Sequence, residues 1–173
     1  MPMNGRSMAG ETLDSFDSVD HRILAILQTE GRLGLTEIGR RVNLSQPAVS
    51  ARVKRLEQAG VISGYRAVVD PARLGLNIHA VVRLRTTQAR VAACLDHFAA
   101  LPEVVTVHRL TGEDCFLIDI YAATAQRLET VVDGIARFGP VTTSLVLRTY
   151  ESGTITPPGT PPARPVTGSG GRV

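Results

Sequence analysis

The stretch SQPAVSARVKRLEQAG, residues 45–60 of this 173-residue chain, decides how the N-terminal half folds. Ser45 is a strong helix N-cap, and Pro47 falls in the first turn, where its missing N–H costs no hydrogen bond. Gly60 is typical of a helix end. The apolar residues recur at helical spacing, at Val49, Val53 and Leu56. We therefore expect an amphipathic helix with one buried side.

Shorter elements are predicted on both sides of this helix. Apolar residues at helical spacing predict a first helix over 19–30 with Ser18 as N-cap, and a second begins at Thr36. Downstream, Val61-Ile62 and 65–69 form two β segments around the turn Ser63-Gly64. Three helices followed by a hairpin predict a winged helix-turn-helix, in which the third helix enters the DNA major groove.

The charge distribution favours a polyanionic partner for this half. Residues 38–66 carry six basic side chains and one acidic side chain, whereas residues 1–37 carry three basic and six acidic ones. The chain as a whole has a formal charge of only +3. A basic segment of this kind is expected where a protein neutralises phosphates and releases their counterions. The alternative is that these basic side chains only form a solvent-exposed helix face and bind no partner.

The predicted burial of residues 49, 53 and 56 turns the opposite side of the third helix outward. That side carries Gln46, which is suited to an adenine edge, and Ser50, which can bond to any base. Basic side chains farther along are expected to contact phosphates. The predicted DNA-binding residues are Arg40, Arg41, Ser45, Gln46, Pro47, Ser50, Arg52, Lys54 and Arg55. Two alternatives stay open: Gln46 is merely solvated, or Arg52 pairs with a carboxylate inside the protein.

The C-terminal half predicts a second, mixed architecture. Strands are expected over 79–84, 104–110, 116–121 and 141–147, and helices over 90–100 and 125–138. On the second strand, simple alternation puts residues 105, 107 and 109 on one side. The order βαββαβ predicts a ferredoxin-like sheet with both helices on one face. The fold class is therefore α+β.

The chain resembles the Lrp/AsnC family, the feast/famine transcriptional regulators. The resemblance rests on collinear positions from Leu13 to Tyr65, and it continues to about Tyr150 through the strand order. The matching residues are Asp20, Ile23-Leu24, Leu27, Gly31-Arg32, Glu37-Ile38, Val42, Leu44-Ser45, Val49, Arg52-Val53, Arg55-Leu56-Glu57, Gly60-Val61-Ile62 and Gly64-Tyr65. The resemblance implies a sequence-specific DNA-binding regulator whose sheet domain binds an amino acid or a similar small effector between subunits.

The resemblance also implies where the effector binds. In relatives, the loop between the second and third strands lines the cleft, and here that loop is Gly112, Glu113, Asp114 and Cys115. Carboxylates can hold an ammonium group, and hydroxyls or backbone N–H groups can hold a carboxylate. The implied effector-binding residues are Gly112, Glu113, Asp114, Cys115, Thr143 and Ser144. Alternatively, Gly112 serves only the turn, and Cys115 is a packed neutral thiol.

The remaining features argue against several other classes. Cys94 and Cys115 match no zinc or disulfide spacing, and the four histidines show no metal spacing, so we expect neither a metal nor a cofactor. No signal peptide or membrane span is evident, which favours the cytoplasm. We divide the chain into a disordered start (1–12), the winged helix-turn-helix (13–66), a hinge (67–76), the ferredoxin-like domain (77–151) and a disordered Gly/Pro-rich tail (152–173).

A single DNA-reading helix covers only a few base pairs, so we expect a homodimer that spans two half-sites on double-stranded DNA. Dimers can associate further, up to an octamer. Two other functions stay open. Sirohaem decarboxylases resemble this fold, although the basic helix and the lack of an acid/base cluster favour a non-enzyme. A sequence-tolerant architectural DNA binder would share the salt dependence but not the preference for particular sequences.

Overall fold

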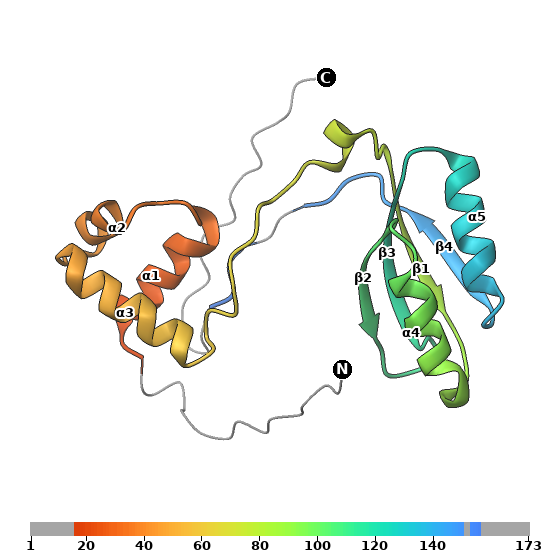
Figure 1. The fold of residues 1–173 in the computed structure, drawn as a ribbon, viewed down its shortest axis with the longest axis horizontal. Helices are drawn as coiled ribbons and strands as arrows, with labels where there is room; N and C mark the ends of the chain where they lie inside the picture. Colours follow the sequence, from red (N-terminus) through yellow and green to blue (C-terminus); the bar gives the residue numbers. More distant parts are fainter. Residues whose placement is uncertain (1–15, 151–152, 157–173) are drawn as a thin grey trace. The chain divides into compact units, whose positions relative to one another are not determined.

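The protein is described here by a computed structural model that covers residues 16–150 and 153–156. The chain divides into two compact units, one of residues 1–67 with 150–173 and the other of residues 68–149. Helices make up the first unit, and a sheet with helices makes up the second (Figure 1). The predicted disordered start (1–12) lies outside the described residues, as does the predicted tail apart from residues 153–156.

The helical unit contains α1 (Ser18–Thr29), α2 (Leu35–Val42) and α3 (Gln46–Gln58). These are the three helices that the apolar spacing predicts. Each contributes its apolar stripe to one shared core, in which the buried residues are Ile23, Ile38, Val42, Val49, Val53 and Leu56. Burial of these branched side chains is the main stabilising term for so small a unit. The helical phase expected for α3 is confirmed.

The helix starts differ from expectation at two places. Asp17, not Ser18, is the N-cap of α1, because its carboxylate accepts the N–H groups of Val19 and Asp20 at 2.9 Å each. The Asp20 carboxylate in turn accepts the N–H of Asp17 at 3.1 Å, which completes a capping box. Helix α2 begins one residue before Thr36. Ser45 caps α3 as predicted, and its hydroxyl accepts the N–H of Ala48.

The predicted wing does not form: residues 61–69 contain no strand. The N–H groups of Val61 and Ile62 both donate to the carbonyl of Leu56, at 2.9 and 3.1 Å, and so close the end of α3. These amides are therefore not free to pair with a second strand. Beyond them Val68 is 92% exposed and Val69 is 57% exposed, so these two side chains gain little burial that would hold the segment in a hairpin. The helical unit is a helix-turn-helix without a paired wing.

The sheet unit has the predicted βαββαβ order. Its strands are β1 (Ile78–Leu84), β2 (Val104–Arg109), β3 (Phe116–Ala122) and β4 (Val141–Leu145). Its helices are α4 (Val91–Ala99), which follows the short 3₁₀ turn η3 (Gln88–Arg90), and α5 (Ala125–Ala136). The strands lie in the order β2-β3-β1-β4, and every neighbouring pair is antiparallel. Another 3₁₀ turn, η2 (Pro71–Leu74), lies in the segment predicted as the hinge.

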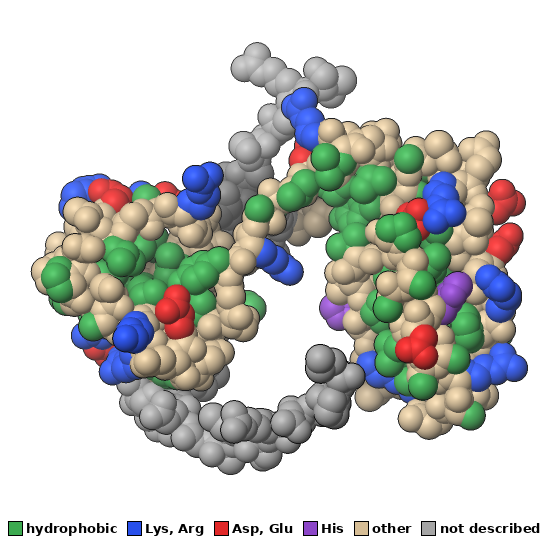
Figure 2. Space-filling view, in the orientation of Figure 1, with side chains coloured by type: hydrophobic (Ala, Val, Ile, Leu, Met, Phe, Trp, Pro, Cys, Tyr) green, Lys and Arg blue, Asp and Glu red, His purple; other side chains and the backbone are tan. Residues whose placement is uncertain are grey.

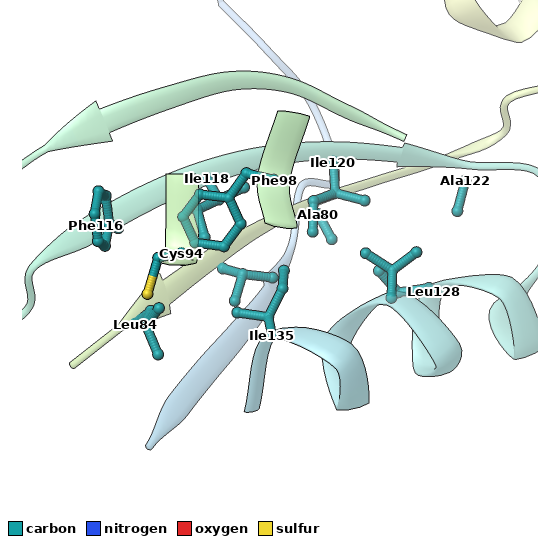
Figure 3. Close-up of a cluster of buried hydrophobic side chains, with 12 residues drawn as sticks. Ala80, Leu84, Cys94, Phe98, Phe116, Ile118, Ile120, Ala122, Leu128 and Ile135 are labelled. Carbon is teal, nitrogen blue, oxygen red and sulfur yellow. The ribbon is translucent and has the colours of Figure 1, made fainter. Parts of the chain in front are cut away.

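The core of this unit lies between one face of the sheet and the two helices (Figure 3). Alternate residues of β1 and β3 point into it, and Cys94 and Phe98 of α4 meet them. The Phe98 and Phe116 rings pack edge to face with centroids 5.3 Å apart. Both helices therefore cover one face, as the sequence predicts, and among the described residues no helix covers the other.

Strand β2 does not alternate as expected. A bulge between Val104 and Thr106 shifts the pairing with β3, so that Val104 faces Ile120 and Val107 faces Ile118. Both valines consequently pack against the core, while Val105 is 63% exposed. A bulge adds one residue to one strand, and it thereby reverses the inward and outward sides beyond it. The sequence contains no glycine there to signal this.

The segment 153–156 belongs to the helical unit. The side-chain amide of Gln28 on α1 donates to the backbone carbonyl of Ile155 at 2.9 Å, and the Ile155 N–H donates to the side-chain oxygen of Gln28 at 2.7 Å. The Gln28 side chain thus satisfies both backbone groups of Ile155, as the backbone of a neighbouring β-strand would. The unit is thus assembled from two parts of the chain that are far apart in sequence.

Candidate nucleic-acid interface

The outward side of α3 presents three polar side chains in a row. Gln46, Ser50 and Lys54 are all exposed, and they follow one another at four-residue intervals. On the opposite side of the helix, Val49 and Leu56 are completely buried. Because the buried stripe anchors the helix, the outward row is held in a fixed direction. This arrangement can offer an amide, a hydroxyl and an ammonium group to one extended ligand.

A shallow hollow lies beside this row. It has a volume of about 470 Å³, and its walls are Leu35, Ser50, Val53, Lys54, Glu57 and Tyr65. The Tyr65 hydroxyl donates to the Glu57 carboxylate at 2.9 Å, and burial together with this carboxylate raises the pKa of Tyr65. The sequence assigned Tyr65 to the wing and missed this contact. The turn signal at residues 63–64 gave no indication of it.

Two of the predicted phosphate contacts point elsewhere. The Arg52 guanidinium donates to Asp17 at 2.8 Å and to Asp20 at 2.9 Å. Arg55 donates to the other carboxylate oxygen of Asp20 at 2.5 Å, and its guanidinium lies 5.3 Å from the centre of the Phe16 ring. The side chain of Asp20 is completely buried. Arg52 therefore forms the internal ion pair that the sequence left open as an alternative.

The arginines of α2 are also paired. Arg40 donates to Glu37 at 2.7 Å, and Arg41 contacts both Glu37 and Glu30. Hydrogen bonds from Arg40 and then Arg41 lower the pKa of Glu37 to about 2. Acidic and basic side chains accordingly lie next to one another on the visible face of this unit (Figure 2). Within the described part of the chain, Lys54 is the member of the predicted cationic set that has no ion-pair partner.

In the loop that is predicted to bind the effector, the acidic side chains are paired with arginines. Glu113 accepts from Arg85 at 2.5 Å, and Asp114 lies 3.9 Å from Arg83. Gly112 has a φ of 104°, which a residue with a side chain rarely adopts. The loop is therefore built as a tight turn whose carboxylates already have cationic partners.

Cys115 closes the same loop against the end of β1. Its Sγ donates to the carbonyl of Thr86 at 3.0 Å and accepts the Thr86 N–H at 3.5 Å. This N–H, followed by the Arg109 side chain, lowers the pKa of the Cys115 thiol. The thiol is thus a hydrogen-bonded part of the turn rather than an inert apolar filler.

The structure does not bring the loop together with the two predicted residues of β4. Thr143 pairs with Val82 and Ser144 with Val81, so the two side chains point to opposite faces of the sheet. Thr143 lines a hollow of about 430 Å³ beside α5, and none of residues 112–115 lines it. Within a single chain, the six predicted effector residues do not share one pocket.

Residues 16–150 and 153–156 contain no group of three or more His, Cys, Asp or Glu side chains that could hold a metal ion. They also contain no helix that is long and apolar enough to cross a membrane. His79 instead lies 3.1 Å from Asp119 and stacks on the Tyr121 ring.

Each of the two units matches a domain of a known protein family. Residues 16–57 match the AsnC-type helix-turn-helix domain, and residues 79–155 match the Lrp/AsnC ligand-binding domain. The transcriptional regulator FL11 of Pyrococcus furiosus is 29% identical over 82% of this chain and 95% of its own length.

Solved structures agree with these matches. LrpC of Bacillus subtilis superposes with a TM-score of 0.74 at 26% identity, covering 79% of this chain and 97% of that one. The regulator NMB0573 of Neisseria meningitidis, solved with L-methionine, has a TM-score of 0.72 at 30% identity, covering 82% and 96%.

Proposed function

Because the chain belongs to the Lrp/AsnC family of transcriptional regulators, with a DNA-binding helix-turn-helix and a ligand-binding domain, we propose that it reads double-stranded DNA through the outward row of α3. Gln46 and Ser50 have the chemistry to bond to base edges, and Lys54 has a charge without an ion-pair partner among residues 16–150 and 153–156. The observation that carries the proposal is this exposed row opposite a fully buried stripe. Arg40, Arg41, Ser45 and Pro47 belong to the same proposed DNA-binding set, and Ser45 and Pro47 also form the start of α3.

Two substitutions test the row. Lys54→Ala should weaken binding to every duplex and should reduce the slope of log K against log salt by about 0.9, the value of one phosphate contact. Lys54→Arg keeps the charge and should keep the slope. Gln46→Ala should instead relax preference at one base pair, at a cost of roughly 1–3 kcal/mol, with the slope unchanged. Identical profiles for Lys54→Ala and Gln46→Ala would show that the helix does not face DNA in this way.

The proposal includes a homodimer formed by the open face of the sheet. Side chains of β1 and β3 that alternate with the core residues line this face: His79, Val81, Arg83, Leu117, Asp119 and Tyr121. Most of them are half-buried although no described helix covers them. A second copy would cover the apolar members and supply the second DNA-reading helix that useful specificity requires. Further association into a tetramer of dimers belongs to the same proposal.

Light scattering tests this assembly. Wild-type protein should be larger than the 18.5 kDa monomer at micromolar concentration. Leu117→Lys should dissociate it, because it places a charge on the proposed interface. Thr130→Lys adds the same charge on the exposed side of α5 and should leave the assembly intact. A wild-type monomer would refute the dimer.

We further propose that an amino acid is the effector and that no cofactor is needed. The support is the matched ligand-binding domain and the L-methionine complex of the Neisseria regulator. The implied site is residues 112–115 with Thr143 and Ser144, completed between subunits. A thermal-shift screen against the twenty amino acids should find at least one that raises the melting temperature, and Asp114→Ala should abolish that shift.

The location proposed for such a regulator is the cytoplasm, where bacterial and archaeal DNA lies. The relatives named above are regulators, which favours this function over sirohaem decarboxylation. Incubation with sirohaem separates the two, since a decarboxylase would release a decarboxylated product. Equal affinity for upstream DNA and random duplex would instead indicate an architectural binder.

A further inference from the structure

Helix α1 holds two arginines of α3 through one buried carboxylate. Asp20 is completely buried, and its two oxygens accept from Arg52 at 2.9 Å and from Arg55 at 2.5 Å. The N–H of Asp17 donates to the same group at 3.1 Å. Asp17 itself accepts a second bond from Arg52 at 2.8 Å. We call these four residues, Asp17, Asp20, Arg52 and Arg55, the α1–α3 ion cluster.

The α1–α3 ion cluster is electrically balanced, with two carboxylates against two guanidiniums. A buried carboxylate is costly unless it is paired, so removal of either partner leaves a strong drive to restore the pairing. The guanidiniums are consequently committed to α1. They nevertheless lie close to solvent: the side chain of Arg55 is 51% exposed and that of Arg52 is 28% exposed.

These arginines lie on the same helix as the outward row, Arg52 before Lys54 and Arg55 directly after it. Phosphate contacts bind every DNA sequence alike, so each added cation raises affinity for random DNA as much as for an operator. Specificity depends on the ratio of the two affinities, which the base contacts set. An arginine that is withheld from phosphates therefore leaves more of the binding free energy to base contacts.

We propose that Asp20 is a positioning residue, which holds Arg52 and Arg55 away from DNA phosphates and so lowers the sequence-independent part of DNA binding, including binding to unrelated sequences. This inference rests on the proposed DNA-reading side of α3. Asp20 acts only through the arginines and does not itself touch DNA. If the role of Asp20 were purely structural, its replacement would lower the fraction of folded protein. The protein that stayed folded would still bind DNA with the wild-type salt dependence.

The test compares full-length wild type with Asp20→Asn, which removes the charge at almost constant shape. Fluorescence anisotropy would measure binding to the protein's own upstream duplex and to a scrambled duplex of equal length, at several salt concentrations. Asp17 still holds Arg52 in this variant, so mainly Arg55 is released. We expect the slope on both duplexes to steepen by about 0.9, or roughly 3.5-fold more loss of affinity between 50 and 200 mM salt. At low salt the affinity for both duplexes should rise by a similar factor, so the ratio between them, which the base contacts set, should stay unchanged.

Two further variants keep the test decisive. Arg55→Gln in the Asp20→Asn background removes the released charge and should restore the wild-type slope. If Asp20→Asn does not fold, Arg55→Gln in the wild-type background replaces it, because Arg52 and the Asp17 N–H still bond to Asp20 there. That variant should keep the wild-type slope, because an arginine that is withheld from phosphates has no phosphate contact to lose.

The possible failures are distinguishable. Salt-dependent binding by wild type, together with an unchanged slope in folded Asp20→Asn or a slope reduced by about 0.9 in Arg55→Gln, would overturn this inference alone. Absence of salt-dependent binding by wild type would overturn the proposed DNA-reading side, and this inference with it.

Discussion

The replacement Gly39→Ala should destabilise the helical unit, although it improves helix propensity. Gly39 is buried in α2, and a Cβ there would lie 2.5 Å from the carbonyl oxygen of Leu44 and 3.5 Å from a methyl group of Val49. An ordinary nonbonded contact is about 3.5 Å, so the Leu44 carbonyl would have to move by about 1 Å. That carbonyl is backbone, in the turn directly before the Ser45 cap.

Two opposing terms decide the magnitude. Alanine gains about 1 kcal/mol over glycine in a helix interior. Overpacking typically costs about 1–3 kcal/mol, and we expect the upper end because backbone rather than a side chain must shift. The net loss should therefore be about 1–2 kcal/mol. Since the displaced turn sets the start of α3, DNA affinity should fall as well.

Amide hydrogen exchange in α2 and α3 would measure this loss, because it reports local stability in a chain with two units. Gly34→Ala is the control for the steric term: no atom lies within 4 Å of its Cβ position, and its φ of −68° suits alanine. Because Gly34 is the N-cap of α2, alanine there should cost roughly 0.5–1 kcal/mol through the weaker cap, and it should not displace the Leu44 turn. Equal or greater protection in Gly39→Ala than in wild type would refute the steric argument.

Other predictions concern acid stability, thiol reactivity and the sheet core. The N–H of Asp20 and the Arg52 side chain lower the pKa of Asp17 from 3.8 to about 2, so its stabilising contribution is complete above pH 4 and disappears as the pH falls toward 2. Denaturation of wild type and Asp17→Asn should converge over that range, and a constant difference would contradict it. Cys115, whose pKa is lowered, should react with a disulfide reagent faster than buried Cys94, whose pKa is raised; Cys115→Ser should remove the fast phase. Ile118→Ala should cost the sheet unit about 2–5 kcal/mol in thermal unfolding, against little for exposed Val105→Ala.

The charge of α3 illustrates how far a linear sequence can be interpreted. The excess of basic residues over 38–66 is evident from counting, and it favours a nucleic-acid partner. Which of these residues are available to DNA is a different question. Arg52 and Arg55 are separated from Asp20 by 32 and 35 positions, so no local pattern signals their pairing. The sequence left the internal pair of Arg52 open as an alternative, and it did not identify the partner.

The predicted wing shows that strand propensity alone does not make a strand. Val61 and Ile62 have strand propensity, but strand formation also requires free amides and a partner. In the fold both amides donate to the carbonyl of Leu56, and Ile62 packs on the helical core. A short apolar pair after a helix can therefore close that helix instead of starting a hairpin.

The sequence alone determined the helices, the order of helices and strands along the chain, and the direction in which α3 turns its polar row. These features depend on residue spacing over a few neighbouring positions. Only the tertiary structure decided the bulge in β2, the loss of the wing and the commitment of Arg52 and Arg55 to α1. Each of these depends on hydrogen bonds or ion pairs whose partners come from another element. Such partners become known only when the chain is folded.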